Sequence, residues 1–254
     1  MTLPKETNTK DALEYELFPS DNDLEIPLLR LDMQPKAADI PFVGYGEQAR
    51  TFKMEGKGTL HFYVDDYRFT AIWKDFAPIL AHNPKNIVEP NFSLYAETPT
   101  AFGLQEIYKK RAIARKMQDL GYPVFVDLNV NHKFYKLNML GVPRGYSAFC
   151  TRGYSERLPY LEFEWKLAKD WADGNPLLFV IFGGGAQCKQ FACEHHCVYV
   201  TPMIIMKNYN KRFERRLTAE IALNFPDFED TKTLVSKATE KTFQNQVYNY
   251  LPME

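Results

Sequence analysis

The sequence predicts an α/β domain whose sheet is mostly parallel, with about five or six strands and flanking helices. Short apolar segments alternate along the chain with longer segments in which apolar residues recur every three or four positions. The run Leu177–Phe182 is apolar throughout, as is typical of a strand buried on both faces. Alternation of this kind implies right-handed crossovers between parallel strands. An open doubly wound sheet and a sheet curled toward a barrel both fit the pattern.

Three segments of different character divide the chain. Residues 1–57 carry recurring prolines before any long periodic pattern appears, which predicts an extended N-terminal arm that packs across the domain at Ile26–Leu31 and Ile40–Val43. Residues 58–206 are expected to form the α/β core domain. Residues 207–254 begin with a run of basic residues, and we expect a basic helical C-terminal tail packed on the core.

The elements of the core are expected in a regular order. Seven segments are strand candidates, and about five or six of them are expected to alternate with helices in the sheet: His61–Val64, Tyr67–Ile72, Asn86–Phe92, Pro123–Val130, Tyr146–Thr151, Leu177–Phe182 and Cys197–Val200. The helix candidates are Trp73–Ala81, Thr98–Leu120, Leu158–Ala172 and Gln187–His195. In the clearest helix, Thr98 is a candidate cap, Pro99 suits the first turn and Gly121 ends the helix.

Composition is that of a globular protein from a reducing compartment. Hydrophobic residues make up 45% and charged residues 25% of the chain, which is ordinary globular usage. No apolar run approaches the roughly 20 residues that span a bilayer, so we expect no membrane contact. The 4 cysteines are too few for a disulfide scaffold, and the polar N-terminus lacks a signal peptide's apolar stretch. We therefore expect a cytoplasmic protein, whose oligomeric state the sequence does not indicate.

Polar residues lie where the expected strands end, which is the edge at which parallel sheets bind ligands. Glu89 closes one strand, Asp127 and Asn129 lie along the next, and Arg152 ends the third. A carboxylate within an apolar strand needs a partner. We predict a catalytic site of Glu89, Asp127, Asn129 and Arg152, with Mg²⁺ joining the carboxylates. The structural alternative is a buried pair of acid and arginine that holds adjacent strands together.

A cluster of cysteine and histidine residues lies near the end of the core domain. Cys188, Cys193, His196 and Cys197 are candidate ligands for Zn²⁺, which prefers four such side chains in a tetrahedron. The cluster lacks the C-x2-C spacing of a zinc knuckle, and free cysteines are commonly buried as small apolar residues. The preceding Gly183-Gly184-Gly185 is interpreted as a tight strand-to-helix turn, because it lacks the spacing of a phosphate-binding loop.

Basic residues gather on two expected helices and form a candidate face for binding the phosphates of nucleic acid. One set is Lys109, Lys110, Arg111, Arg115 and Lys116, and the other is Lys207, Lys211, Arg212, Arg215 and Arg216. The net charge of −1 gives no global support for nucleic-acid binding, so we favour ordinary solvated helix faces over a binding role.

The stretch from Trp73 to Gly185 resembles a known family. It contains Glu89-Pro90-Asn91-Phe92-Ser93-Leu94-Tyr95, then Tyr108-Lys-Lys-Arg111, and later Gly141-Val142-Pro143 before Ser147–Gly153. This order is similar to an uncharacterised domain family carried by bacteriophages, plasmids and other mobile elements, in which the N-F-S-L-Y segment is the most recognisable part. The resemblance implies a role in DNA replication, transfer or host takeover, and it assigns no catalytic residue.

Two functions follow as hypotheses. The first is a factor in a DNA transaction (replication or transfer), with a polar pocket at the carboxyl edge of the sheet and a divalent ion bound there. The alternative is a non-catalytic binding module that contacts nucleic acid or a host protein through its basic helices. The sequence leaves open whether the protein is an enzyme.

Overall fold

In the part of the chain that the structure describes, seven parallel strands follow one another in chain order across one sheet. The computed structural model describes Leu13, residues 16–46 and residues 54–202. The strands are β1 Phe42–Gly44, β2 Thr59–His61, β3 Asn86–Val88, β4 Val124–Asp127, β5 Ala148–Arg152, β6 Leu178–Phe182 and β7 Val198–Val200. The expected parallel α/β fold is confirmed, but the expected count of five or six strands is wrong. Strand β1 lies within the segment expected to be an arm, and its three residues are too few to show a pattern.

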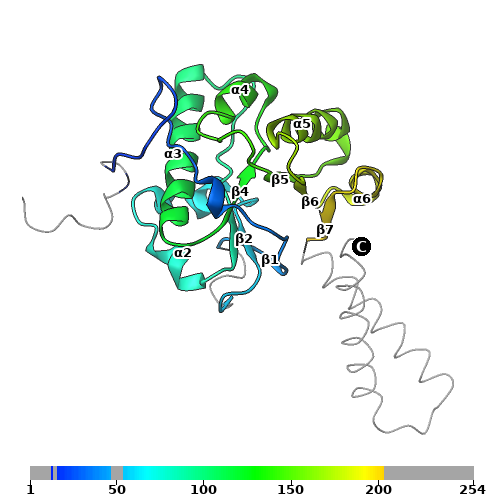
Figure 1. Cartoon of the computed structure of the whole chain (residues 1–254), viewed down its shortest axis with the longest axis horizontal. Coiled ribbons are helices and arrows are strands. Elements are labelled where there is room, and N and C mark those ends of the chain that lie inside the picture. The colour runs from blue at the N-terminus through cyan, green and yellow to red at the C-terminus, as the bar shows by residue number, and fades with distance from the viewer. Residues whose placement is uncertain (1–12, 14–15, 47–53, 203–254) are drawn as a thin grey trace, which may run out of the picture.

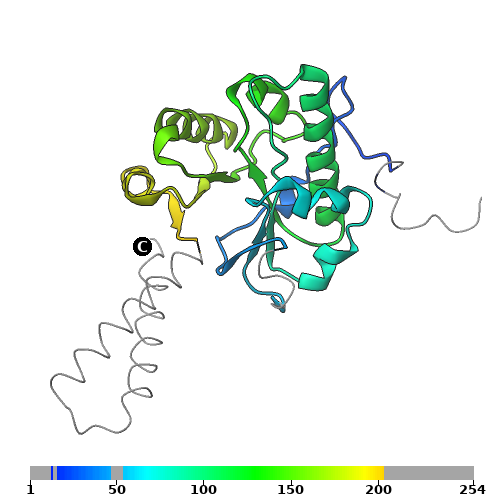
Figure 2. The same ribbon diagram turned by 180° about the vertical axis from the view of Figure 1, so that it is seen from behind.

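The sheet curls until it is nearly barrel-shaped. The ring of Phe182, at the end of β6, stacks on the ring of Phe42 in β1 with centroids 6.2 Å apart. The same ring lies 4.2 Å from the ring of His61 in β2. Side chains from β6 and from β1 and β2 therefore pack in one interior. Of the two sheets that the sequence allowed, the structure has the one curled toward a barrel. Figures 1 and 2 show helices following one another around the strands.

The helices occupy the connections between strands. The α-helices are α2 Ala77–His82, α3 Thr100–Asp119, α4 Tyr135–Asn138, α5 Leu158–Trp171 and α6 Gly185–Glu194, and the 3-10 helices are η1 Leu31–Met33, η2 Asp66–Arg68, η3 Thr70–Trp73, η4 His132–Phe134 and η5 Ser155–Arg157. The expected strand Tyr67–Ile72 is wrong, because η2 and η3 occupy that segment. It buries Phe69 and Ile72, and so short an apolar run does not distinguish strand from helix. No helix among the described residues is long and apolar enough to cross a bilayer.

Helix α3 ends as the sequence predicts and begins differently. Gly121 has a φ of 93°, its backbone N–H donates to the Gln118 carbonyl, and the Tyr122 N–H donates to the Met117 carbonyl. This pair of bonds is a Schellman motif, which satisfies carbonyls at the end of the helix. The predicted cap at Thr98 is wrong. Pro99 occupies the cap position, and the Thr98 hydroxyl instead accepts a bond from the Tyr95 N–H at 3.0 Å.

The segment before β1 covers the amino ends of the strands. The Thr59 hydroxyl, at the start of β2, donates to the Asp39 carbonyl at 2.6 Å. The Asn86 amide, at the start of β3, donates to the Asp39 carboxylate at 2.8 Å. The Gln34 side-chain oxygen accepts from the backbone N–H of Ser147, just before β5, at 2.7 Å. These bonds close the amino edge of the sheet, so the polar side chains described next belong to the opposite, carboxyl edge.

Candidate functional site at the carboxyl edge of the sheet

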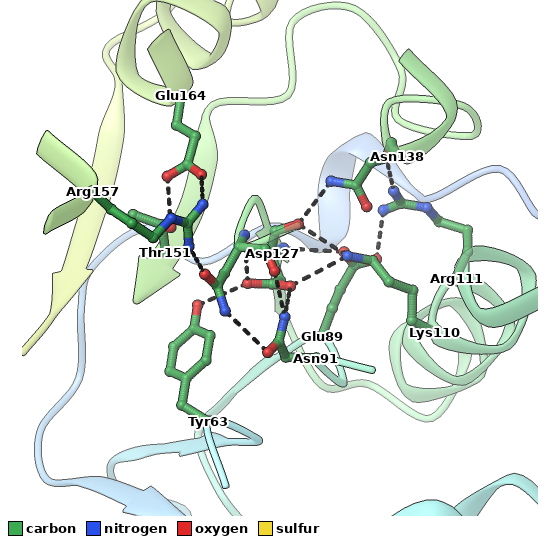
Figure 3. Close-up of polar contacts among 11 residues, drawn as sticks. Tyr63, Glu89, Asn91, Lys110, Arg111, Asp127, Asn138, Thr151, Arg157 and Glu164 are labelled. Carbon is green, nitrogen blue, oxygen red and sulfur yellow. Dashed lines mark hydrogen bonds and ion pairs between the residues drawn. The ribbon is translucent and has the colours of Figure 1, made fainter. Parts of the chain in front are cut away.

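Two acids and two bases, all buried, form an ion network where β3 and β4 end (Figure 3). Glu89 accepts a bond from the Arg111 guanidinium at 2.5 Å and another from the backbone N–H of Asp127 at 3.1 Å. The Lys110 ammonium lies 3.3 Å from the Asp127 carboxylate and donates to the Asp127 carbonyl at 3.0 Å. Each acid thus has a cation beside it, as buried charges require.

Neutral groups complete the shell around Asp127. One carboxylate oxygen accepts from the Tyr63 hydroxyl at 3.0 Å and from the Asn129 N–H at 3.1 Å. The other accepts from the Asn91 amide at 2.9 Å, in addition to its contact with Lys110. Burial raises the pKa of Glu89, and its neighbours Arg111 and Lys110 oppose that rise. Because every oxygen of both acids already accepts from the protein, the arrangement matches the structural alternative in the sequence analysis.

The cations that pair with the two acids come from helix α3 and not from the end of β5. We expected Arg152 to face Glu89 and Asp127, whereas the cations beside them are Lys110 and Arg111 from α3. The interpretation of these two residues as a solvated face is wrong, since their side chains are 2% and 0% exposed. A signal was present in the sequence. Both residues lie three or four positions after Ile107, on the stripe of α3 that faces the sheet.

A second polar group lies beside the first and centres on Glu164 of α5. Its carboxylate accepts from the Tyr135 hydroxyl at 3.0 Å, from the Thr151 hydroxyl at 2.7 Å and from the Arg157 guanidinium at 2.8 Å. Burial raises the pKa of Glu164 to about 7, against the lowering effect of Arg157. The other side of the Arg157 guanidinium donates to the side-chain oxygen of Asn129, which joins the two groups (Figure 3).

Glu164 is a site residue that the sequence analysis missed. It lies in a helix with several exposed charges, and a glutamate there is usually solvated. The available signal was its spacing, because Leu161, Glu164 and Ala168 are three or four positions apart and are the buried residues of α5.

Arg152 stands apart from both groups. Its guanidinium lies over the ring of Tyr154, 4.9 Å from the centroid, and Arg157 lies over the same ring at 5.8 Å. It makes no ion pair or hydrogen bond with the described residues, whereas every other arginine described is ion-paired. Burial and the nearby Arg152 lower the pKa of His61 to about 3, so His61 is neutral at physiological pH.

The structure therefore brings Glu89, Asp127 and Asn129 together and leaves Arg152 beside Tyr154. The catalytic roles predicted for these four residues stay predictions. The basic cluster Lys207, Lys211, Arg212, Arg215 and Arg216 lies outside the described residues.

The predicted zinc ligands do not form a set. Cys188 is buried, Cys193 is exposed, and burial raises the pKa of the Cys197 thiol to about 12. Within the described ranges, no three His, Cys, Asp or Glu side chains are placed to hold a metal ion. The Mg²⁺ expected between Glu89 and Asp127 stays a prediction. The glycine run that leads into α6 is a tight turn with positive φ at all three residues, and a Cβ on Gly184 would overlap the Cys188 sulfur and the Gly153 backbone.

Fold and site together define a class, that of α/β proteins with a nearly closed parallel sheet and a polar site at its carboxyl edge. Residues 18–189 match the family described as Domain of unknown function (DUF4417), and the chain belongs to this family. It is similar to the "Gene 1 protein" of Mycobacterium phage D29, with 29% identity over 121 residues that cover 45% of this chain and 43% of that protein.

A second relative is the "Gene 1 protein" of Mycobacterium phage L5, with 32% identity over 122 residues, which are 45% of this chain and 50% of that protein. The chain thus spans about half the length of the curated relatives it matches. No solved structure matches it. The predicted association with phages is confirmed, whereas the N-F-S-L-Y segment as a motif of the family stays a prediction.

Proposed function

We propose that this protein binds the phosphate groups of DNA at the carboxyl edge of its sheet and acts in a phage DNA transaction. The observation that carries the proposal is Arg152, a half-buried residue without an ion pair among the described residues although every other arginine described has one. Arginine binds phosphate through two parallel hydrogen bonds. Arg152 ends β5, at the edge where parallel sheets bind ligands.

A second cation supports the same site. Arg157 lies over the Tyr154 ring beside Arg152, and Glu164 and Asn129 hold its guanidinium in one orientation. Preorganised cations lose little conformational entropy when they bind an anion. In this proposal Asn129 and Glu164 are positioning residues that act through Arg157.

The buried acids have a different part in the proposal. Glu89 and Asp127 join β3 and β4 to α3 through Lys110 and Arg111, and Asp127 also fixes the backbone of Asn129. They hold β4 in place beside β5, the strand that Arg152 ends, and they support Asn129, which binds Arg157. The DNA-transaction role draws its biological support from the phage relatives.

Measurement of DNA binding by fluorescence anisotropy tests the proposal. With a labelled oligonucleotide of about 12 nucleotides, offered single-stranded and as a duplex, we expect Arg152→Met to weaken binding about tenfold, because one charge-assisted contact is lost. The matched control is Arg144→Met, in the turn before the amino end of β5, where Arg144 is exposed and paired with Asp170. Absence of DNA binding, or equal effects of the two substitutions, would contradict the proposal.

A further inference from the structure

The exposed aromatic side chains gather at the carboxyl edge of the sheet. The exposed aromatic residues among those described are Tyr67, Tyr95, Phe102, Tyr160 and Phe163, and the exposed aliphatic ones are Leu17, Leu24, Leu31, Ile40 and Leu120. Every one of these aromatics lies in a segment that follows the carboxyl end of a strand. Of the aliphatics, Leu31, Ile40 and Leu120 lie on the side of the amino ends, and Leu17 and Leu24 lie in the segment before β1. Single exposed apolar residues are ordinary, but five exposed aromatic residues that all follow carboxyl ends of strands need a reason.

The aromatic segments are tied to one another. Ser93, in the loop of Tyr95, donates its hydroxyl and its backbone N–H to the Asp66 carboxylate beside Tyr67, both at 2.9 Å. The Lys133 ammonium donates to the carbonyls of Ala96 and Thr98, on the other side of Tyr95. These bonds join the loops that follow β2, β3 and β4 into a continuous rim.

The rim continues to the proposed phosphate site. The ring of His132, next to Lys133 in η4, stacks on the ring of Tyr160 in α5, with centroids 6.1 Å apart. The guanidinium of Arg157 lies 5.6 Å from the centroid of Tyr160 and also faces Tyr154, over which Arg152 lies. The aromatic rim, by which we mean Tyr67, Tyr95, Phe102, Tyr160 and Phe163 with the loops that join them, thus ends at the two arginines.

We infer that the aromatic rim binds single-stranded DNA, with bases stacked on its rings and a phosphate at Arg152. The inference rests on the proposed function, because it names the form of DNA that the site takes. Exposed rings beside cations are the recurring means of binding single strands, since every unpaired base offers a flat face to a ring. A duplex keeps those faces stacked inside. An apolar protein partner fits less well, because no exposed aliphatic residue among those described lies in the segments that carry the exposed rings, and Leu31, Ile40 and Leu120 lie at the other edge.

The oligonucleotides of the Arg152 experiment also test the rim. We expect the wild type to prefer the single strand to the duplex. Tyr160→Ala and Tyr95→Ala should each weaken single-strand binding about tenfold, by loss of one stacked base, and leave duplex binding unchanged. Tyr160→Phe keeps the ring and should bind like the wild type. The control Leu120→Ala removes an exposed aliphatic side chain at the amino edge and should have no effect.

The outcomes separate the two proposals. If Arg152→Met weakens DNA binding while Tyr160→Ala and Tyr95→Ala bind the single strand as tightly as the wild type, the rim is not the contact and the phosphate site stands. If the tyrosine variants lose single-strand and duplex affinity equally, the rings do not stack on unpaired bases, and the inference about the rim is wrong. A thermal melt of each variant identifies a loss that comes from unfolding. An oligoribonucleotide of the same sequence distinguishes DNA from RNA, and tighter binding of the RNA contradicts the inference.

Discussion

Glu164 carries a carboxyl group that the fold withdraws from water and surrounds with a phenol, a hydroxyl and a guanidinium. Burial disfavours its charged form, and Asp127 adds to the effect, whereas Arg157 opposes it. The pKa rises from 4.5 to about 7 as a result. The charge on Glu164, and with it the strength with which it holds Arg157, changes near physiological pH.

This shift predicts how stability depends on pH. Between pH 4.5 and about 7 the folded protein holds a proton on Glu164 that the unfolded chain has released, so stability falls as the pH rises through that window. Glu164→Gln removes this contribution. The free energy of unfolding of the wild type, relative to the variant, should fall by roughly 3 kcal/mol across the window. Urea unfolding at several pH values measures it.

A neighbouring residue provides the control for that experiment. Glu162 is exposed on the same helix, and its hydrogen bond and ion pair with Lys166 lower its pKa. Its titration therefore lies below the window, and Glu162→Gln should leave the slope unchanged. Parallel curves for the wild type and Glu164→Gln would show that Glu164 does not titrate there.

Single residues also mark the limit of prediction from this sequence. The acids Glu89 and Asp127 were identifiable, because a carboxylate within an apolar strand is costly to bury and so indicates a special site. Their partners were harder to identify, because the run Lys109-Lys110-Arg111 is charged throughout and only its spacing from Ile107 indicates which of its members are buried. The sequence predicts which face of a helix is apolar. How deeply a long basic side chain on that face is buried depends on the strands that the helix packs against.

Among the elements, α3 contributes most to the site, because it brings both cations to the buried acids. Its position depends on close contact with η4. A Cβ on Gly103 would overlap the ring of Phe134, so α3 can approach this ring closely only because residue 103 has no side chain. Phe134 is itself fully buried.

Gly103→Ala should therefore destabilise the protein. Alanine stabilises an ordinary helical position by about 1 kcal/mol relative to glycine, but here overpacking should reverse the sign and cost about 1–3 kcal/mol. Chemical denaturation measures the change. In the background of Phe134→Leu, which replaces the ring with a smaller side chain, the same substitution should cost less. An equal cost in both backgrounds would contradict the steric explanation.

The elements also differ in how well the sequence predicts them. Strands β4, β5 and β6 and helices α3 and α5 carry enough periodic or uninterrupted apolar residues to be recognised. Strand β1 and the helices η2 and η3 have three or four residues each, too few for any period. Their conformation is decided by neighbours in space, which a local pattern does not contain.

At the scale of the whole molecule, the curl of the sheet depends on an aromatic interior. Phe182 contacts the rings of Phe42, His61 and Tyr63, which come from the first two strands and the residues just after them. Among the described strands, no backbone pairing joins the two ends of the strand order, and these ring contacts join them instead. Side-chain packing therefore closes the interior where backbone pairing does not.

Phe182→Ala should cost about 3–5 kcal/mol in the free energy of unfolding, as is usual for a buried phenylalanine, and Phe182→Leu should cost less. The control is Phe102→Ala, whose ring is 61% exposed and should contribute little to stability. Guanidinium denaturation, with near-ultraviolet circular dichroism to follow the rings, measures both. If the two alanine variants lose the same amount, the interior ring does not hold the curl.

The agreement between strand order and chain order has a consequence for how the polypeptide acquires its shape. Each strand pairs with the one made immediately before it, so no strand must wait for a distant partner. Such local pairing lowers the entropy lost in loop closure. Because the ribosome synthesises the chain from its N-terminus, each strand emerges after the strand with which it pairs. The sheet can therefore grow by one strand at a time during translation.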